Sequence, residues 1–290
     1  DLGKVREGFL RDDLFVCVHE QFMTETAEMA DIVLPATTFL EHDDLYVAGG
    51  HTYLQVARAV IEPLGETRCN HDVLSALAER LGAAHPGFET DTWGLMDETL
   101  RRSGYSDARS IWEGHWEDRA LPFEESHFLN GFGHPDGKFH FAPDWSKIGG
   151  NHHGMPRLPD HDANIDNRDD EHPFRLVTAP SRNYLNSSFT ETATSQTREG
   201  RPEAQIHPDV CAELGLEDGG LVRIGNAQGS VVVHVRPTDG VRRGTVIVES
   251  IWPNRAFVEG IGINLLVSAE AGRPNGGAVF HDTAVWLRAP

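Results

Sequence analysis

The second half of the chain consists of closely spaced short strands, and this pattern limits the fold more than any other feature. Runs of β-branched and apolar residues alternate with turn sequences such as 226–229 and 239–240. One short helix interrupts them, with Pro208 at a first-turn position and Gly215 at its end. Several strands and one small helix in so short a span indicate a compact barrel. We predict its strands at residues 174–178, 221–224, 230–235, 245–249 and 284–287.

The first part of the chain has an α/β pattern instead. Residues 13–18 and 31–35 are short apolar runs of the kind found in buried parallel strands, and Pro35 ends the second run. Between them lies a short helix that Thr24 would cap. Two strands joined by so short a helix favour one edge of a doubly wound sheet.

Three longer helices follow in the pattern. The first covers residues 72–81, with Asn70 as the cap and Gly82 at the left-handed position that ends it. The second covers 92–102, and the third covers 106–116 although a glycine interrupts it. These helices complete the α/β part.

The two patterns are separated by residues 131–171, which are rich in Gly, Pro, His, Asn and Asp. Such a composition is typical of a solvated connector. We therefore place a domain boundary near His172, with residues 1–171 as the α/β part and its acidic connector, and residues 172–290 as the barrel. The acidic residues that end the connector are Asp160, Asp162, Asp166, Asp169, Asp170 and Glu171.

Composition excludes two classes of partner. The 25 Lys and Arg residues against 45 Asp and Glu give a formal net charge of -20, which repels nucleic-acid backbones. No apolar run approaches the ~20 residues of a membrane helix, so we predict no membrane segment. Residues 1–4 contain neither a signal peptide nor an initiator Met, which indicates a cut or processed start and favours a cytoplasmic protein.

Thiols and imidazoles form no recognisable metal site in the sequence. Cys17, Cys69 and Cys211 are too widely spaced for a disulfide framework or a CxxC ligand set, which favours a reducing compartment. The nearest histidine candidates are the adjacent His152 and His153, with His161, but no HExxH-like helical spacing occurs. We predict no metal ligand and no catalytic residue in this chain.

Residues 179–188 are the best candidate for a phosphate-binding loop. They follow a predicted strand and place Arg182 among hydroxyl and amide side chains without a carboxylate. A guanidinium with neutral donors beside it suits a phosphate group. An ordinary polar turn is an equally open interpretation. The GxG turn at 259–264 is weaker, because a single GxG is common.

Several segments resemble motifs of one enzyme family. Residues 16–35, followed by Glu41, resemble the "TxTAxxADIVLP…E" signature of molybdopterin oxidoreductases of the dimethyl sulfoxide reductase family. Residues 133–141 are similar to the "TPSGKxEF" segment of that family, and 206–219 resemble the start of its C-terminal molybdopterin-dinucleotide-binding domain. Residues 264–266 fall where the family has "N-L-T". The chain is thus identified as similar to the C-terminal portion of such enzymes.

The resemblance implies a fold and a cofactor. The fold is an α/β segment followed by a double-psi β-barrel, and the cofactor is molybdenum bis(molybdopterin guanine dinucleotide). The family's loop after the first barrel strand wraps one cofactor, an amide at Asn264 bonds the pterin, and His281 stands where relatives often have Lys. Thr24 and Thr26 match the first motif, although Thr24 also suits a plain helix cap. The cofactor-binding residues so implied are Ser181, Arg182, Asn183, Leu185, Asn186, Ser187, Ser188, Asn264, His281, Thr24 and Thr26.

The resemblance also implies two-electron redox chemistry of a small-molecule substrate at the metal, with electrons passed to an electron-transfer partner. The metal ligand, and an iron–sulfur cluster where one exists, would lie in an N-terminal part of the same enzyme, so this chain alone is expected to be inactive. Two alternatives stay open. One is a non-catalytic structural subunit or scaffold in an electron-transfer complex. The other is a barrel that acts as an independent binding module, against which the motif at 24–35 argues.

Overall fold

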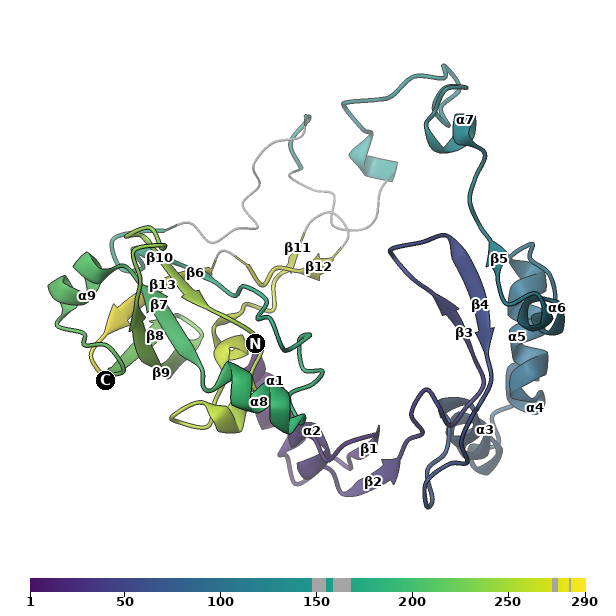
Figure 1. Ribbon diagram of the computed structural model, residues 1–290, viewed down its shortest axis with the longest axis horizontal. Coiled ribbons are helices and arrows are strands. Elements are labelled where there is room, and N and C mark those ends of the chain that lie inside the picture. The colour runs from purple at the N-terminus through teal and green to yellow at the C-terminus, as the bar shows by residue number, and fades with distance from the viewer. Residues whose placement is uncertain (148–154, 159–167, 273–275, 282) are drawn as a thin grey trace. The chain divides into compact units, whose positions relative to one another are not determined.

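The computed structural model describes the whole chain except residues 148–154, 159–167, 273–275 and 282 (Figure 1). The chain forms two compact units, of which one is Phe15–Phe139 and the other joins Asp1–Leu14 to His140–Pro290. The barrel's first strand begins at Phe174. The domain boundary near His172 stays a prediction.

The unit that contains the C-terminus is built around the barrel. Its helices and strands are α1 Leu2–Phe9, η1 Trp145–Lys147, β6 Phe174–Val177, α8 Ala193–Glu199, β7 Glu203–Ile206, α9 Pro208–Leu214, β8 Leu221–Asn226, β9 Gly229–Pro237, β10 Thr245–Val248, η2 Asn254–Ala256, η3 Ile263–Leu266, β11 Ala271–Gly272, β12 Gly277–Ala278 and β13 Thr283–Arg288.

Six of these strands close into a barrel in the order β10-β6-β13-β8-β9-β7. The pairs β10–β6 and β7–β9 are parallel, and the remaining pairs are antiparallel. The predicted fold, an α/β segment followed by a double-psi β-barrel, is confirmed. All five predicted barrel strands are present, as is helix α9, which ends at Gly215 in the left-handed conformation.

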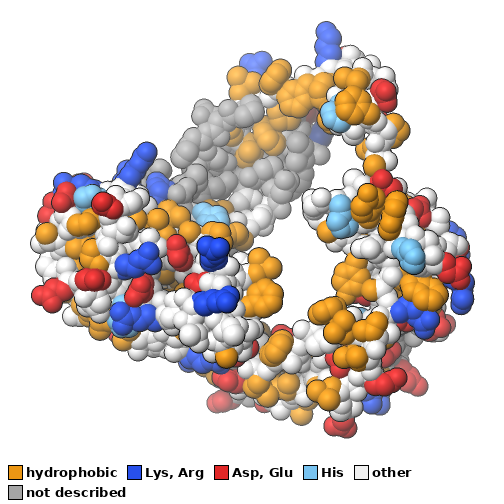
Figure 2. Space-filling view, in the orientation of Figure 1, with side chains coloured by type: hydrophobic (Ala, Val, Ile, Leu, Met, Phe, Trp, Pro, Cys, Tyr) orange, Lys and Arg blue, Asp and Glu red, His pale blue; other side chains and the backbone are white. Residues whose placement is uncertain are grey.

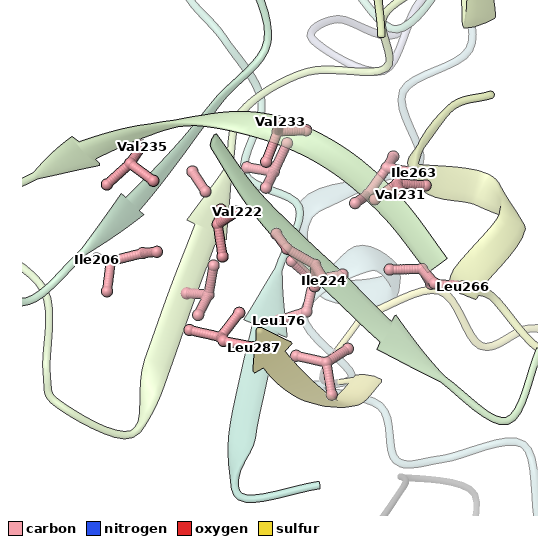
Figure 3. Close-up of a cluster of buried hydrophobic side chains, with 14 of the residues drawn as sticks. Leu176, Ile206, Val222, Ile224, Val231, Val233, Val235, Ile263, Leu266 and Leu287 are labelled. Carbon is pink, nitrogen blue, oxygen red and sulfur yellow. The ribbon is translucent and has the colours of Figure 1, made fainter. Parts of the chain in front are cut away.

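The barrel encloses one apolar core (Figure 3). Side chains from β6, β7, β8, β9 and β13 point into it together with Ile263 and Leu266 of η3. Val222, Ile224, Val231 and Leu266 are fully buried. Burial of each such side chain contributes about 1.5–3 kcal/mol, so this core is what holds the loops at the barrel's edge in place.

The other unit is an α/β assembly. Its elements are β1 Cys17–Glu20, α2 Glu25–Glu28, β2 Ile32–Pro35, β3 Asp44–Val47, β4 Tyr53–Ala57, α3 Asn70–Leu81, α4 Pro86–Glu89, α5 Thr92–Arg102, α6 Ala108–Glu113, β5 Glu117–Asp118 and α7 Phe123–Ser126. β1 and β2 pair in parallel, while β3, β4 and β5 form an antiparallel sheet.

The helices agree with the prediction at some of their ends, but α3 already begins at Asn70, so its cap is Cys69 and not the predicted Asn70. α3 ends at Gly82 with φ of 66°, and α5 covers the predicted residues. The prediction for 106–116 was too long. Helix α6 begins only after Asp107, whose carboxylate accepts a hydrogen bond from Ser110 N at 2.9 Å, and it ends at Gly114. An aspartate cap and a glycine therefore limit this helix to two turns.

The predicted parallel pairing of the first two strands is correct, but the first strand covers Cys17–Glu20 and not 13–18, and the predicted burial of both strands is wrong. Cys17 is exposed and Ile32 is 46% exposed. In the described part of the chain these two strands form a sheet of their own, which leaves much of their surface uncovered. The apolar face of α3 is open as well, with Leu74 56% and Leu81 81% exposed.

Apolar side chains also gather on the surface around α7 (Figure 2), where Phe123 and Leu129 are 62% and 64% exposed. Within the described residues, no helix combines the length and the apolar character needed to cross a membrane.

Candidate functional site

The loop that follows β6 lies at the edge where two parallel strands end. Parallel strands β6 and β10 direct their carboxyl ends to the same side of the sheet. Ser250, just after β10, donates its backbone N–H to the carbonyl oxygen of Ala179 at 2.8 Å. The loop and the residues after β10 are therefore neighbours, although some seventy positions separate them in sequence.

A tight turn forms the outer part of this loop. Leu185 and Ser188 exchange two backbone hydrogen bonds of 3.2 and 2.9 Å, and Asn186 adopts a positive φ of 52° that asparagine tolerates well. Thr190 supports the turn by donating its hydroxyl to Ser187 O at 2.7 Å. The turn presents the exposed residues Leu185, Asn186, Ser187 and Ser188 to solvent.

A carboxylate reaches the inner part of the loop, which the sequence window alone did not reveal. Oε1 of Glu199, the last residue of α8, accepts hydrogen bonds from Asn183 N at 2.6 Å and from Asn183 Nδ2 at 2.7 Å. Next to it, Tyr184 is buried and packs edge-on against Trp252, with ring centroids 5.0 Å apart. Burial, and then the charges of Glu199 and Glu191, raise the pKa of Tyr184.

Two buried hydroxyl groups at this edge lack a hydrogen-bond partner among the described residues. They are Oγ of Ser181, in the loop, and Oγ of Ser250, whose residue is 5% exposed. Leaving such a group unsatisfied costs on the order of 1–3 kcal/mol. A ligand with many polar edges would satisfy both groups. These two residues therefore fit a dinucleotide cofactor such as the one that the motifs imply.

Arg182 directly follows Ser181 in the loop. It is exposed, and its side chain forms no ion pair with any described residue. Arg255 differs from it, because its Nη2 lies 2.7 Å from Glu191 Oε1. A guanidinium without a carboxylate partner can donate two parallel hydrogen bonds to a phosphate group. The local chemistry agrees with the phosphate-binding interpretation.

Asn264 lies on η3, which is linked to the same loop through η2 and the residues before it. It is an exposed residue of η3, and its neighbours Ile263 and Leu266 are buried in the barrel core. Asn254 Oδ1 accepts a hydrogen bond from Gly262 N at 2.7 Å and so joins η3 to η2. The Tyr184–Trp252 and Glu191–Arg255 contacts then connect η2 and the residues before it to the loop.

His281 also lies at this edge of the barrel. Its Nδ1 is 3.4 Å from Oγ1 of Thr178, the residue that follows β6. The imidazole is exposed and is tilted against the ring of Phe280, with centroids 4.5 Å apart. The structure thus brings His281 to the start of the loop, where β6 and β13 pair.

Thr24 and Thr26 belong to the other unit. Thr24 Oγ1 accepts a hydrogen bond from Ala27 N at 3.3 Å and caps α2, as its position in the sequence predicts. Asp31 Oδ2 accepts a hydrogen bond from Val16 N at 2.7 Å, which fixes the start of the two-stranded sheet. Their role in cofactor binding stays a prediction.

No group of three or more His, Cys, Asp or Glu residues is placed to hold a metal ion in the part of the chain that the structure describes. The histidine candidates His152, His153 and His161 lie outside the described residues.

Glu41, from the first motif, is a buried structural carboxylate. It is 7% exposed and accepts hydrogen bonds from Thr38 N at 2.7 Å, Thr38 Oγ1 at 2.9 Å and Leu64 N at 2.7 Å. The hydrogen bond from the Thr38 backbone, then those from Leu64 N and the Thr38 hydroxyl, lower the pKa of Glu41. The carboxylate thus ties the segment after β2 to the chain near Leu64.

We predict that this carboxylate stabilises the protein at neutral pH and loses that effect in acid. Because its pKa is lower in the folded than in the unfolded state, the stabilisation is complete above the unfolded value of about 4.3 and disappears as the pH falls through the folded value. Thermal unfolding of wild type and Glu41→Gln between neutral and acidic pH measures this. The stability difference should be largest near pH 7 and shrink below pH ~4; a constant difference would contradict the prediction.

Two family models match the chain. Residues 1–80 match the molybdopterin oxidoreductase model, and residues 174–284 match the Molydopterin dinucleotide binding domain. Together they match more than half of the chain, and the second includes the loop after β6 and Asn264.

Relatives of known description agree with this match. The chain is 31% identical to a "Probable oxidoreductase YoaE" of Bacillus subtilis, over 99% of this chain and 42% of the relative. It is 30% identical to the trimethylamine-N-oxide reductase of Haemophilus influenzae, over 87% of this chain and 34% of the relative. The chain therefore spans about a third to two fifths of the length of these relatives.

The fold has a counterpart among solved structures. Acetylene hydratase from Pelobacter acetylenicus superimposes with a TM-score of 0.77 at 19% sequence identity, over 99% of this chain and 42% of that protein. At this identity the likeness concerns the fold. The motifs, the two family models and the barrel with its loop agree, and we conclude that the chain belongs to the molybdopterin oxidoreductase family.

Proposed function

We propose that the chain is the C-terminal, cofactor-binding part of a molybdenum oxidoreductase that acts on a small substrate. Its ligand is molybdenum bis(molybdopterin guanine dinucleotide), held at the barrel edge by the loop after β6. The observation that carries the proposal is the pair of buried hydroxyls, Ser181 Oγ and Ser250 Oγ, which lack partners among the described residues. The match of residues 174–284 to the Molydopterin dinucleotide binding domain supports it.

The proposal assigns specific cofactor contacts to five residues in and near the loop. The Arg182 guanidinium binds the cofactor's pyrophosphate, and Ser181 and Ser250 donate hydrogen bonds to its polar edges. Asn264 hydrogen-bonds the pterin, and His281 contacts the cofactor at the start of the loop. The bound cofactor supplies the two-electron redox chemistry at its metal, and the protein orients it and excludes water.

The remaining contacts proposed for the cofactor come from Asn183, Leu185, Asn186, Ser187 and Ser188 of the loop, and from Thr24 and Thr26 of the other unit. Because the chain spans about 42% of one relative's length, we place the metal ligand, the substrate-facing residues and any iron–sulfur cluster in the rest of a longer protein. That longer protein would pass electrons to a separate partner. The cytoplasmic location stays a prediction.

One observation favours the alternative of a non-catalytic structural subunit. Glu199 accepts hydrogen bonds from both the main chain and the side chain of Asn183, so these donors are already engaged within the loop. A negative charge at this position also opposes an anionic ligand. In a structural subunit the loop would hold no cofactor and Glu199 would simply fix its shape.

The double variant Ser181→Ala/Ser250→Ala in the full-length protein tests the proposed function. Loss of two hydrogen bonds of about 1 kcal/mol each should lower bound molybdenum and guanine nucleotide by about thirtyfold under limiting cofactor. The cofactor-free protein should unfold at an unchanged or higher temperature, because unsatisfied hydroxyls are removed. Metal analysis, nucleotide release and thermal unfolding measure these quantities.

Ser75→Ala provides the matched control, because Ser75 Oγ is also buried and unsatisfied but lies on α3 in the other unit. It should leave cofactor content unchanged. Wild-type protein that contains no molybdenum, when produced in cells that make the cofactor, would support the structural alternative. Equal cofactor content in wild type and the double variant would overturn the loop assignment.

A further inference from the structure

A pocket lies in the Phe15–Phe139 unit and is not part of the loop region. Its lining combines two guanidinium groups, two indole rings and one carboxylate: Arg58, Arg109, Trp93, Trp112 and Asp91. Arg58 follows β4, whereas the other four come from α5, α6 and the residue that caps α5. These elements share a buried apolar cluster that includes Leu54, Met96 and Ile111, so the pocket has a rigid base.

The guanidinium of Arg58 contacts two aromatic rings. Its Cζ lies 5.6 Å from the ring centroid of Trp93 and 5.2 Å from that of Trp112. The Trp93 ring is itself fixed, because its Nε1 donates a hydrogen bond to Asp43 Oδ2 at 2.6 Å. Ring contacts occupy the faces of a guanidinium and leave its in-plane N–H groups free to donate.

The second cation of the pocket is Arg109 on α6. Neither Arg58 nor Arg109 forms an ion pair with a described residue, whereas Arg102 in the same unit pairs with Glu98 at 2.7 Å. The one acidic group of the pocket, Asp91, already accepts a hydrogen bond from Gly94 N at 2.7 Å. Two positive charges against one negative charge leave the pocket with a positive balance, in a chain whose net charge is -20.

We propose that this pocket binds a small oxyanion group, a phosphate or a carboxylate, between Arg58 and Arg109. Planar guanidinium groups bind both kinds of group through paired N–H donors. The pocket is preorganised for this, because Trp93 and Trp112 fix the Arg58 side chain before the ligand arrives and so lower the entropy lost on binding. The proposal concerns a different unit from the loop after β6 and does not depend on the function assigned to that loop.

Isothermal titration calorimetry of the full-length protein at low salt tests this site, with inorganic phosphate and succinate as separate probes. We expect saturable binding of at least one probe, and the probe that binds identifies the group. Arg58→Gln and Arg109→Gln should each weaken it by about tenfold or more, the loss of one charge-assisted hydrogen-bonded pair. Arg58→Lys keeps the charge and the ring contacts without the paired donors, so it should bind with intermediate affinity.

Arg101→Gln is the matched control, because Arg101 is an exposed arginine of α5 that does not line the pocket. It removes the same charge and should leave the affinity unchanged. The molybdenum content of all four variants should equal that of wild type, which separates this site from the loop after β6. Absence of saturable binding of both probes to wild type, or equal affinity in wild type and both Gln variants, would overturn the proposal.

Discussion

Arg182→Ala in the full-length protein is expected to lower bound molybdenum and guanine nucleotide by about tenfold or more. The guanidinium is exposed, and it forms no ion pair with a described residue, so its loss leaves the fold intact. Hydrogen bonds to a charged phosphate contribute about 1.5–3 kcal/mol, and 1.4 kcal/mol corresponds to a tenfold change in affinity. Metal analysis and chromatography of the released nucleotide, each per mole of protein, measure the result.

The control for this prediction is Arg198→Ala, on α8 one residue before Glu199. It removes the same charge from an exposed position outside the loop, so it reports the general electrostatic effect and should leave cofactor content near wild type. Arg182→Lys should retain part of the cofactor, because an ammonium group keeps the charge but not the paired donors. Cofactor content unchanged in Arg182→Ala would remove the loop from the proposed site.

The barrel strands can be predicted from the sequence because their own residue types indicate that they are buried. β9 contains Val231, Val232, Val233 and Val235, all 2% exposed or less, and such a run of β-branched residues favours a buried strand. Helix ends are predictable for a similar reason. Gly82 and Gly215 both adopt the left-handed conformation that glycine accommodates without strain.

Two of the strands that the sequence did not predict are β7 and β3, each four residues long. β7 has two buried positions, Ala204 and Ile206, and β3 has none. Each depends on its neighbours instead, since β7 pairs with both β9 and β10 and β3 pairs with β4. Pairing across the chain is a tertiary effect that the residues of one strand do not encode by themselves.

The residues of the candidate site also differ in this respect: some have a local sequence signal, and others are brought to the site only by tertiary contacts. The loop at 179–188 could be found from its composition, because an arginine among neutral polar residues is a local feature. Ser250 and Glu199 could not. Ser250 reaches the loop because β6 and β10 pair in parallel, and Glu199 reaches Asn183 because α8 returns toward the loop. A lone serine after a strand and a glutamate at a helix end carry no signal of these contacts.

Gly225→Val is expected to destabilise the barrel by more than the 1–3 kcal/mol typical of one overpacked position. Gly225 on β8 is buried and pairs with Trp286 on β13. A Cβ atom at this position would lie 2.6 Å from Cη2 and 2.8 Å from Cε2 of the indole. The Arg288 guanidinium lies 4.2 Å from the centroid of this ring, so a shift of the indole would also disturb that contact. Denaturant unfolding of the purified protein, followed by circular dichroism, measures the loss.

Two further variants determine whether the indole is the cause. Gly240→Val is the control, because the nearest atom to its added Cβ is Thr238 Oγ1 at 3.6 Å, and it should change the unfolding midpoint little. In the double variant Gly225→Val/Trp286→Ala the obstructing ring is gone, so the destabilisation should be smaller than the sum of the two single changes. Simple additivity would mean that the close approach of Gly225 to Trp286 does not limit this position, and that valine disturbs the β8–β13 pairing by another route.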